Sequence, residues 1–385
     1  MRRFAMQAAG LVLALAGAAA QAQYNAQFIE TSKAWGSMVA DFNGDGHDDF
    51  LISGHDTDDR LWYWSPTGYV PSAQVLEWVD RHACSAADFN QDGRLDFYCT
   101  VGADRGTDVG FNELWLQDAA GVFHKSTDHG AADPYGRGRL PIAFDMNHDG
   151  YPDLYVTNEA TLRSDGQINI NHVFINQGGT GFVELPTLAT GARGFQCVAK
   201  GDIDQDGWDD LVVCNGSKPG HIYRNNRAGD FVEVASPAIG ANWRDAKLAD
   251  MNHDGRDDLI VLTGTNDLQI WLNSGTGVFF DNAPAYSSHI VVTGKSLTVG
   301  DFNADGLPDV YVTLQKADCQ TTTRHDIAPD LVFQGRATGT WVKFKQPQDY
   351  DGCGHQAATM DGSRVLLMNG GVSYPGPNYA IKWVN

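Results

Sequence analysis

The chain has 385 residues and a formal net charge of −21 at pH 7, with 48 acidic against 27 basic side chains. This acidic balance argues against nucleic acid and anionic membrane surfaces as partners. A chain of this length would ordinarily form two or more domains, unless it is a closed array of repeats.

Residues 1–22 read as a signal peptide. Met1-Arg2-Arg3 supplies a cationic start, an apolar segment follows around "LVLALAGAAA", and Ala20-Gln21-Ala22 is a small-x-small cleavage site. The apolar stretch is too short for a membrane anchor, and no later segment approaches a spanning length. We therefore expect an exported protein, periplasmic or extracellular, with no transmembrane segment in residues 23–385.

A motif of nine residues, rich in Asp, Asn and Gly, recurs six times along the chain. It reads DFNGDGHDD at 41–49 and returns at 88–96, 145–153, 202–210, 250–258 and 301–309. A run of β-branched and aromatic residues follows each copy, and two further short runs follow that one. With the strand before each motif, every unit holds four strands of about five residues, which is typical of a β-propeller blade.

One repeat length beyond the sixth motif, the sequence HQAATMDGSRVLLMNGG keeps only Asp361-Gly362 of the motif. This seventh unit holds three strands, and residues 24–33 read as its missing fourth strand, which would remove the free edge of the ring. The prediction is therefore all-β, with one seven-bladed β-propeller over residues 23–385; six or eight blades are the alternatives. Its four-stranded antiparallel blades start near residues 35, 82, 139, 196, 244, 295 and 355, and the N-terminal strand closes blade 7.

The six motifs offer the oxygen ligands of a calcium loop. Side-chain oxygens occupy positions 1, 3, 5 and 9, a backbone carbonyl serves at position 7, and glycine at position 6 permits a sharp turn. Hard oxygen donors without Cys or His side-chain ligands favour Ca²⁺, and we expect about six structural ions. The predicted ligands are Asp41, Asn43, Asp45, His47 and Asp49; Asp88, Asn90, Asp92, Arg94 and Asp96; Asp145, Asn147, Asp149, Tyr151 and Asp153; Asp202, Asp204, Asp206, Trp208 and Asp210; Asp250, Asn252, Asp254, Arg256 and Asp258; and Asp301, Asn303, Asp305, Leu307 and Asp309.

Position 12, which holds a bidentate Glu in helix-loop-helix calcium sites, is occupied here by strand residues such as Ile52 and Val156, so each loop should join two strands. The motifs resemble the FG-GAP or VCBS repeats of integrin-α-type β-propellers, which also occur in many secreted proteins. The resemblance covers nearly all of residues 23–385 and implies the fold and calcium. It implies function poorly, because this scaffold serves adhesion, sugar binding and some polysaccharide lyases.

The six cysteines predict disulfides in an exported protein. Relative to the first Asp of their motifs, Cys84 and Cys99 lie at −4 and +11, and Cys197 and Cys214 lie at −5 and +12. Both pairs of offsets sum to +7, so each pair should face across a hairpin, with the two bridges on opposite faces of their blades. A third bridge could join Cys319 and Cys353; buried free thiols are the alternative throughout.

A candidate ligand site lies on the face opposite the six motifs, where the long irregular connections should emerge. Six residues before each first Asp, the chain enters the innermost strand from that face. Cations at this position would concentrate an anionic ligand on an acidic protein, although polar residues capping strands beside a wet channel would look the same. The seven residues at this position are Trp35, His82, Arg139, Gln196, Arg244, Lys295 and His355.

Two functions follow from this ring of residues. As a binding protein, the chain would present it to a glycan or an extracellular protein, with Trp35 or Trp243 stacking on sugar rings and the arginines gripping an anionic group. As a polysaccharide lyase, Arg139 and Arg244 would neutralise a uronate carboxylate while His82 or His355 removed a proton and Tyr135 donated one. The binding reading is favoured, and no sequence motif calls for a nucleotide or redox cofactor.

Overall fold

The computed structural model describes residues 23–54, 58–102, 110–134, 136–159, 168–185, 197–214, 219–227, 230–237, 239, 242–275, 280–281, 283–291, 293–315, 330–345, 356–368 and 376–384. These residues form 28 β-strands and no helix. No helix long and apolar enough to cross a membrane occurs within them.

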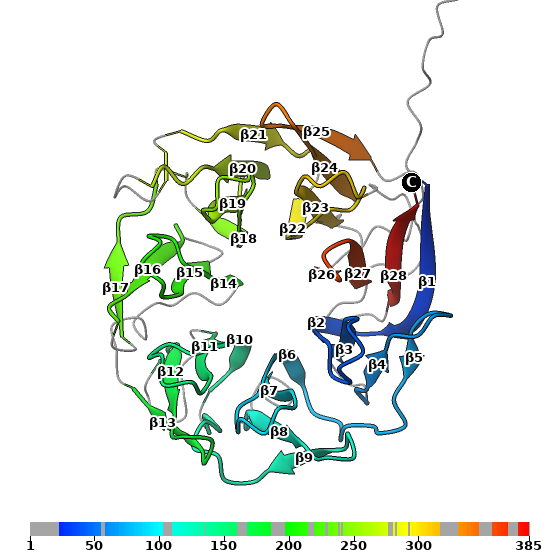
Figure 1. The fold of residues 1–385 in the computed structure, drawn as a ribbon, viewed down its shortest axis with the longest axis vertical. Helices are drawn as coiled ribbons and strands as arrows, with labels where there is room; N and C mark the ends of the chain where they lie inside the picture. Colours follow the sequence, from blue (N-terminus) through cyan, green and yellow to red (C-terminus); the bar gives the residue numbers. More distant parts are fainter. Residues whose placement is uncertain are drawn as a thin grey trace, which may run out of the picture.

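The strands form seven four-stranded antiparallel sheets, which stand as blades around a central axis (Figure 1). Blade 1 contains β2 (Ala34–Ala40), β3 (Asp49–Gly54), β4 (Leu61–Tyr63) and β5 (Val70–Pro71). Blade 2 contains β6 (Arg81–Ala87), β7 (Asp96–Val101), β8 (Glu113–Gln117) and β9 (Phe123–Ser126). Blade 3 contains β10 (Gly138–Phe144), β11 (Asp153–Asn158), β12 (His172–Asn176) and β13 (Phe182–Glu184). Blade 4 contains β14 (Cys197–Gly201), β15 (Asp210–Cys214), β16 (His221–Asn225) and β17 (Phe231–Val234).

Blade 5 contains β18 (Trp243–Ala249), β19 (Asp258–Thr263), β20 (Asp267–Trp271) and β21 (Tyr286–His289). Blade 6 contains β22 (Thr293–Gly300), β23 (Asp309–Gln315), β24 (Leu331–Arg336) and β25 (Thr340–Lys345). Blade 7 contains β26 (Gln356–Met360), β27 (Arg364–Met368), β28 (Gly376–Val384) and, as its outer strand, β1 (Gln23–Ser32). The first strand of each blade faces the axis and the fourth lies on the rim (Figure 1). The predicted seven-bladed propeller is therefore confirmed.

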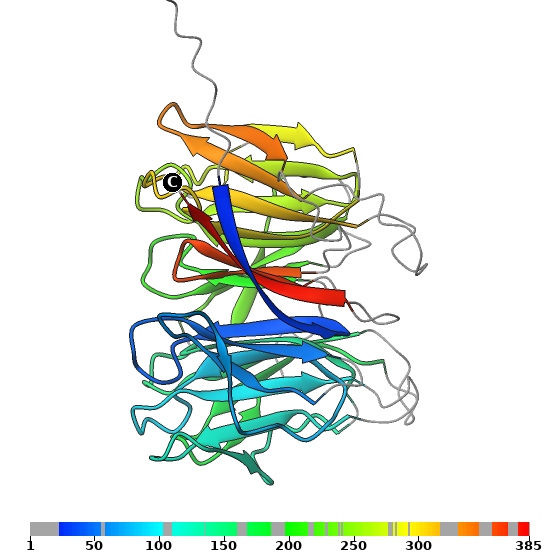
Figure 2. The same ribbon diagram turned by 90° about the vertical axis from the view of Figure 1, so that its right-hand side faces the viewer.

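Blade 7 is closed by strands from the two ends of the described chain. Strand β1 runs antiparallel to β28, with Gln23 opposite Val384 and Phe28 opposite Tyr379. The two strands lie side by side in blue and red when the ring is seen from the side (Figure 2). This pairing was predicted, and it leaves no gap in the ring of blades.

The apolar core is divided among the interfaces between blades. Seven clusters of buried side chains each join one blade to the next; one such cluster packs Leu51 of blade 1 against Phe97 of blade 2. The second strands are buried along their whole length in blades 1 to 5, because neighbouring blades cover both of their faces. No blade has a core of its own, so each depends on its neighbours for burial.

Side-chain amides form hydrogen bonds between neighbouring blades. In blades 2 to 5, an Asn or Gln at or just after the end of the third strand donates a hydrogen bond to a backbone carbonyl of the preceding blade. In blade 6, Gly335 stands at this place and offers no side chain. The four bonds join Gln117 to Phe42 O (3.2 Å), Asn176 to Phe89 O (2.9 Å), Asn225 to Met146 O (2.9 Å) and Asn273 to Ile203 O (2.7 Å).

Two predicted disulfides are confirmed. Cys84 and Cys99 face each other across β6 and β7, and Cys197 and Cys214 do so across β14 and β15. The first bridge packs into the cluster shared with blade 1, and the second into the cluster shared with the following blade 5. They therefore lie on opposite faces of their blades, as predicted. The remaining pair, Cys319 and Cys353, lies outside the described residues.

Candidate functional site

The six acidic loops join the first strand to the second in blades 1 to 6, and each curls around the carboxylate at position 1. In blade 1, Asp41 accepts the N–H groups of Asp45 (3.1 Å) and Gly46 (2.8 Å), one on each oxygen. Gly46 has a φ of 84°, a conformation that favours glycine. The same two bonds recur in the other five loops, so the repeated sequence gives one repeated turn.

The Asp at position 9 has a structural role that the sequence pattern did not reveal. Asp49 is fully buried and accepts one N–H from Phe42 within the loop (3.0 Å) and another from Trp64 after the third strand (2.8 Å). All six loops share this pair of hydrogen bonds. Burial raises the pKa of each position-9 carboxyl, to about 6 in Asp49 and about 7 in Asp153. Position 9 thus ties the loop to the third strand, while each oxygen keeps a second acceptor site for a cation.

The blade 4 loop provides the test of whether a cation fits. Asp202, Asp204 and Asp210 each place a carboxylate oxygen within 4.8 Å of the others. Oδ1 of Asp204 is buried and accepts no hydrogen bond from the described residues. The other five loops carry Asn at position 3, whose amide oxygen is a possible ligand while its amide nitrogen donates to the Asp at position 5. The residues therefore fit a hard divalent cation such as Ca²⁺.

Blade 7 replaces its missing loop with a contact to blade 1. The N–H of Asp48 donates to Oδ1 of Asp361, and the N–H of Asp361 donates to Oδ2 of Asp48, both at 2.6 Å. Arg364 lies 2.9 Å from Asp361 and supplies a positive charge. The Asp361-Gly362 turn that remains in blade 7 therefore connects blade 7 to blade 1.

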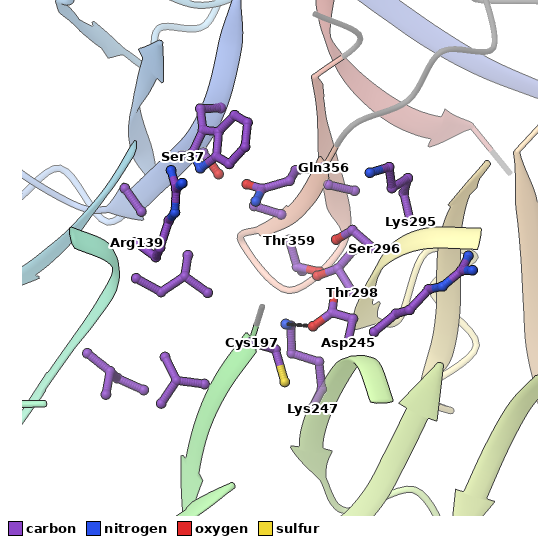
Figure 3. Close-up of a pocket in the computed structure, with 18 of the residues that line it drawn as sticks. Ser37, Arg139, Cys197, Asp245, Lys247, Lys295, Ser296, Thr298, Gln356 and Thr359 are labelled. Carbon is purple, nitrogen blue, oxygen red and sulfur yellow. Dashed lines mark hydrogen bonds and ion pairs between the residues drawn. The ribbon is translucent and has the colours of Figure 1, made fainter. Parts of the chain in front are cut away.

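The central channel holds a cavity of about 740 Å³, lined by the innermost strands (Figure 3). Of the predicted ring, Trp35, Arg139, Arg244 and Lys295 line it. Arg139 and Lys295 lie on opposite sides of the cavity, and the labelled side chains between them include Gln356 and Ser296 (Figure 3). These residues lie at the start of the innermost strands, at the end opposite the acidic loops.

A β-bulge marks the predicted ring position in five blades. In blade 1, Ala34 pairs with Gly54 and Gly36 with Ser53, so Trp35 is an extra residue in the ladder. The same irregularity falls at His82, at Arg139–Leu140, at Arg244 and at Lys295. A bulge changes the direction of a side chain without ending the strand. The ring position is therefore a repeated backbone feature, which residue type alone did not indicate.

On one side of the cavity the ring residues are joined to one another. The Arg139 guanidinium lies 5.2 Å from the centre of the Trp35 ring and forms an ion pair with Glu159. Its Nη1 also lies 2.9 Å from Nε2 of His82. His82 is 1% exposed, and burial lowers the pKa of its imidazole. His82 does not line the cavity, so its ring supports Trp35 and Arg139 from behind.

On the other side the cations have fewer charged partners. Arg244 donates to the side chain of Asn266 and to the backbone carbonyls of Gly264 and Gly294. Lys247, which the sequence did not single out, pairs with Asp245 at 3.0 Å (Figure 3). Regular alternation would place Lys247 on the face opposite Arg244, three residues earlier, so the bulge at Arg244 accounts for both lining one cavity.

Other residues named from the sequence have different positions. Trp243 is fully buried within the core shared by blades 4 and 5, so the expectation that it stacks on a ligand is wrong. Gln196, His355 and Tyr135 lie outside the described residues. Of the groups proposed for lyase chemistry, the described ones are therefore Arg139, Arg244 and the buried His82.

Comparison with known proteins gives one family and one fold. The model of an FG-GAP-like repeat matches residues 41–99, 88–156, 202–261 and 250–312. Integrin alpha pat-2 of Caenorhabditis briggsae is 28% identical over 212 residues, which are 46% of this chain and 17% of that protein. Integrin alpha-3 of Cricetulus griseus is 30% identical over 148 residues, 34% of this chain and 14% of that protein. The chain thus spans less than a fifth of the length of these curated relatives.

Among solved structures, the crystal structure of BBS1N in complex with ARL6DN, soaked with mercury, aligns with a TM-score of 0.55 at 9% identity. The alignment covers 92% of this chain and 93% of that one. At this identity the likeness supports the fold alone.

Proposed function

The chain belongs to the FG-GAP-like repeat family, and from this premise we propose that it is a calcium-stabilised binding protein for an anionic extracellular ligand. The ligand binds at the mouth of the central channel, on the face opposite the acidic loops. The ligand is a glycan or an extracellular protein, and the chain acts after export. Two disulfides between neighbouring strands fit an oxidising compartment.

The charge of the channel carries this proposal. The protein as a whole has a net charge of −21, yet four cationic side chains and one carboxylate line the cavity. A recessed site with one sign of charge attracts ligands of the opposite sign and raises their local concentration. Its volume of about 740 Å³ lies in the usual range of ligand pockets. The lining cations are Arg139, Arg244, Lys247 and Lys295.

Calcium has a structural role in this proposal. The six loops stand at the far end of the innermost strands, so an ion there does not touch a ligand at the opposite mouth. Each ion instead offsets the repulsion among the carboxylates of its loop and fixes the first hairpin of a blade. Because blades share their cores, stabilising one hairpin also stabilises the packing of its neighbours.

The binding test uses the full mature chain in buffer with calcium, against panels of acidic glycans, neutral glycans and extracellular proteins. We expect salt-sensitive binding that Ser37→Trp weakens, because Ser37 lines the cavity and an indole there obstructs part of it. Ser287→Trp, on the exposed rim strand β21, is the matched control.

Absence of binding to any acidic ligand, or equal binding by Ser37→Trp, would contradict the proposal. Appearance of ultraviolet-absorbing unsaturated products from a uronate polysaccharide would instead favour the lyase function. The binding protein and the lyase would both use the same mouth of the channel. The assay for unsaturated products therefore has to distinguish between the two functions.

A further inference from the structure

We infer that the channel contains a dedicated subsite for one carboxylate or sulfate group of an acidic polysaccharide, formed by Arg244 and Lys295. This inference rests on the proposed function and names the ligand class and the residues that recognise its charge.

Two of the four lining cations have a carboxylate partner within the protein. Glu159 pairs with Arg139, which also packs against the Trp35 ring. The same carboxylate lies 3.3 Å from Arg137. Asp245 pairs with Lys247 at 3.0 Å. Each of these two cations is therefore already paired, although Arg139 shares its partner.

Asp245 is engaged by other groups and forms no ion pair with Arg244, its neighbour in sequence. Its Oδ1 accepts the N–H of Ala246 (2.9 Å) and the Lys247 amine, and its Oδ2 accepts the N–H of Leu297 (2.8 Å). Strand β18 bulges between Trp243 and Asp245, and the side chains of Arg244 and Asp245 both line the cavity without pairing with each other. Arg244 forms no ion pair with a described carboxylate.

Arg244 is held in place by neutral groups. Its Nη1 donates to Oδ1 of Asn266 and to the Gly294 carbonyl, both at 3.0 Å, and its Nη2 donates to the Gly264 carbonyl at 3.2 Å. Within the described residues three of its five N–H donors are used, which leaves Nε–H and one hydrogen on Nη2 for a ligand. Such a guanidinium is oriented in advance and keeps its full charge, which suits recognition of a carboxylate or sulfate.

Lys295 stands next to this guanidinium, since the Gly294 carbonyl that holds Arg244 belongs to the preceding residue. Within the described part of the chain, the Lys295 amine has no hydrogen bond or ion pair. Burial and the charge of Arg244 both lower the pKa of Lys295. Two cations facing one cavity without a counter-ion repel each other, and an anion placed between them relieves that repulsion.

The remaining lining favours a sugar chain over a peptide. The cavity wall between these cations and Trp35 carries hydroxyl and amide side chains, namely Ser37, Thr293, Ser296 and Gln356. Groups of this kind both donate and accept hydrogen bonds, as sugar hydroxyls do. The partly buried Trp35 offers a flat ring for stacking on a sugar face, as aromatic residues at binding sites commonly do.

The decisive variant is Lys295→Gln, because it removes a charge without breaking any bond within the described residues. Lys382→Gln, at an exposed residue of β28 outside the cavity, removes an equal charge and is the control. Titration calorimetry would use oligogalacturonate for carboxylate, a sulfated galactan oligosaccharide for sulfate, and a neutral galactan oligosaccharide. Arg244→Gln and Arg139→Gln complete the series, with melting temperature as the check on folding.

We expect Lys295→Gln to weaken binding of the preferred acidic oligosaccharide about tenfold or more, since hydrogen bonds to charged groups contribute about 1.5–3 kcal/mol. Arg244→Gln should do the same, and Arg139→Gln and Lys382→Gln should change the affinity less. Unchanged affinity in Lys295→Gln, while the parent protein binds, would overturn this subsite and leave the proposed function standing. Failure of the parent protein to bind any acidic ligand would overturn both.

Discussion

Asp330 allows a sharp test of the electrostatics of the propeller, because it is a buried carboxyl whose hydrogen-bond partners among the described residues are neutral. It immediately precedes β24 and accepts the Tyr311 hydroxyl at 2.7 Å and the Leu314 N–H at 2.8 Å. Burial raises the pKa of Asp330 from 3.8 to about 6, although both hydrogen bonds oppose the shift. Asp330→Asn keeps the shape of the side chain and removes the charge.

The sign of the effect follows from the direction of this shift. The folded protein holds the Asp330 proton more tightly than the unfolded chain, so this group contributes stability below pH 3.8 that is lost as pH rises through about 6. The interval from 3.8 to about 6, at about 1.4 kcal/mol per pH unit, corresponds to about 3 kcal/mol. The free energy of unfolding of Asp330→Asn should therefore rise by about 2.4 kcal/mol relative to the parent protein between pH 4 and pH 7.5, most of the full difference.

Urea unfolding followed by tryptophan fluorescence, in saturating calcium at several pH values, would measure this difference. Comparing two proteins at each pH cancels the other titrating carboxyls, including those at position 9. Tyr311→Phe removes a hydrogen bond that favours the charged form, so it should steepen the pH dependence. A difference between Asp330→Asn and the parent that stays constant with pH would refute the reasoning.

Three further predictions concern the parts that hold the blades together. Removing calcium with a chelator should lower the melting temperature, since each site loaded at about 100 times its Kd contributes about 2.7 kcal/mol. Added magnesium should restore the melting temperature less well than added calcium. An unchanged melting temperature after chelation would count against the ion sites. Asn225→Ala should lower the free energy of unfolding in urea by about 1–3 kcal/mol, because it leaves the Met146 carbonyl buried without its partner. An unchanged free energy of unfolding would mean that this hydrogen bond between blades is dispensable. Replacing both Cys197 and Cys214 by Ser should lower the free energy of unfolding by about 3 kcal/mol, as expected for a closed loop of this length. Equal stability of the parent protein with and without reductant would contradict this prediction.

The fold was predictable because the nine-residue motif that begins each blade recurs six times in the sequence. Six motifs in the same phase fix the hairpin that begins each blade, and the offsets of Cys84 and Cys99 from their motif fix the register of its strands. The closing strand followed from counting, because blade 7 lacked one strand and residues 24–33 had no other partner. Repetition thus supplied information that one motif alone would not give.

The chemistry of the channel was only partly predictable. Alignment on the first Asp correctly brought Trp35, Arg139, Arg244 and Lys295 to one cavity. It could not show that Glu159, from the end of the neighbouring strand, neutralises Arg139, or that His82 lies beneath it. These relations depend on bulges and on long-range contacts, and a residue-by-residue alignment contains neither.

The pairing of β1 with β28 sets the order in which the ring is completed. Blades 1 to 6 are each made of consecutive strands, so each finds its own strands and those of the next blade nearby in sequence. Blade 7 joins strands separated by more than three hundred residues in sequence, so β1 has no partner until β28 has been made. Closure is therefore the slow, non-local step of folding, and until it occurs β1 is an unpaired strand that another chain could bind.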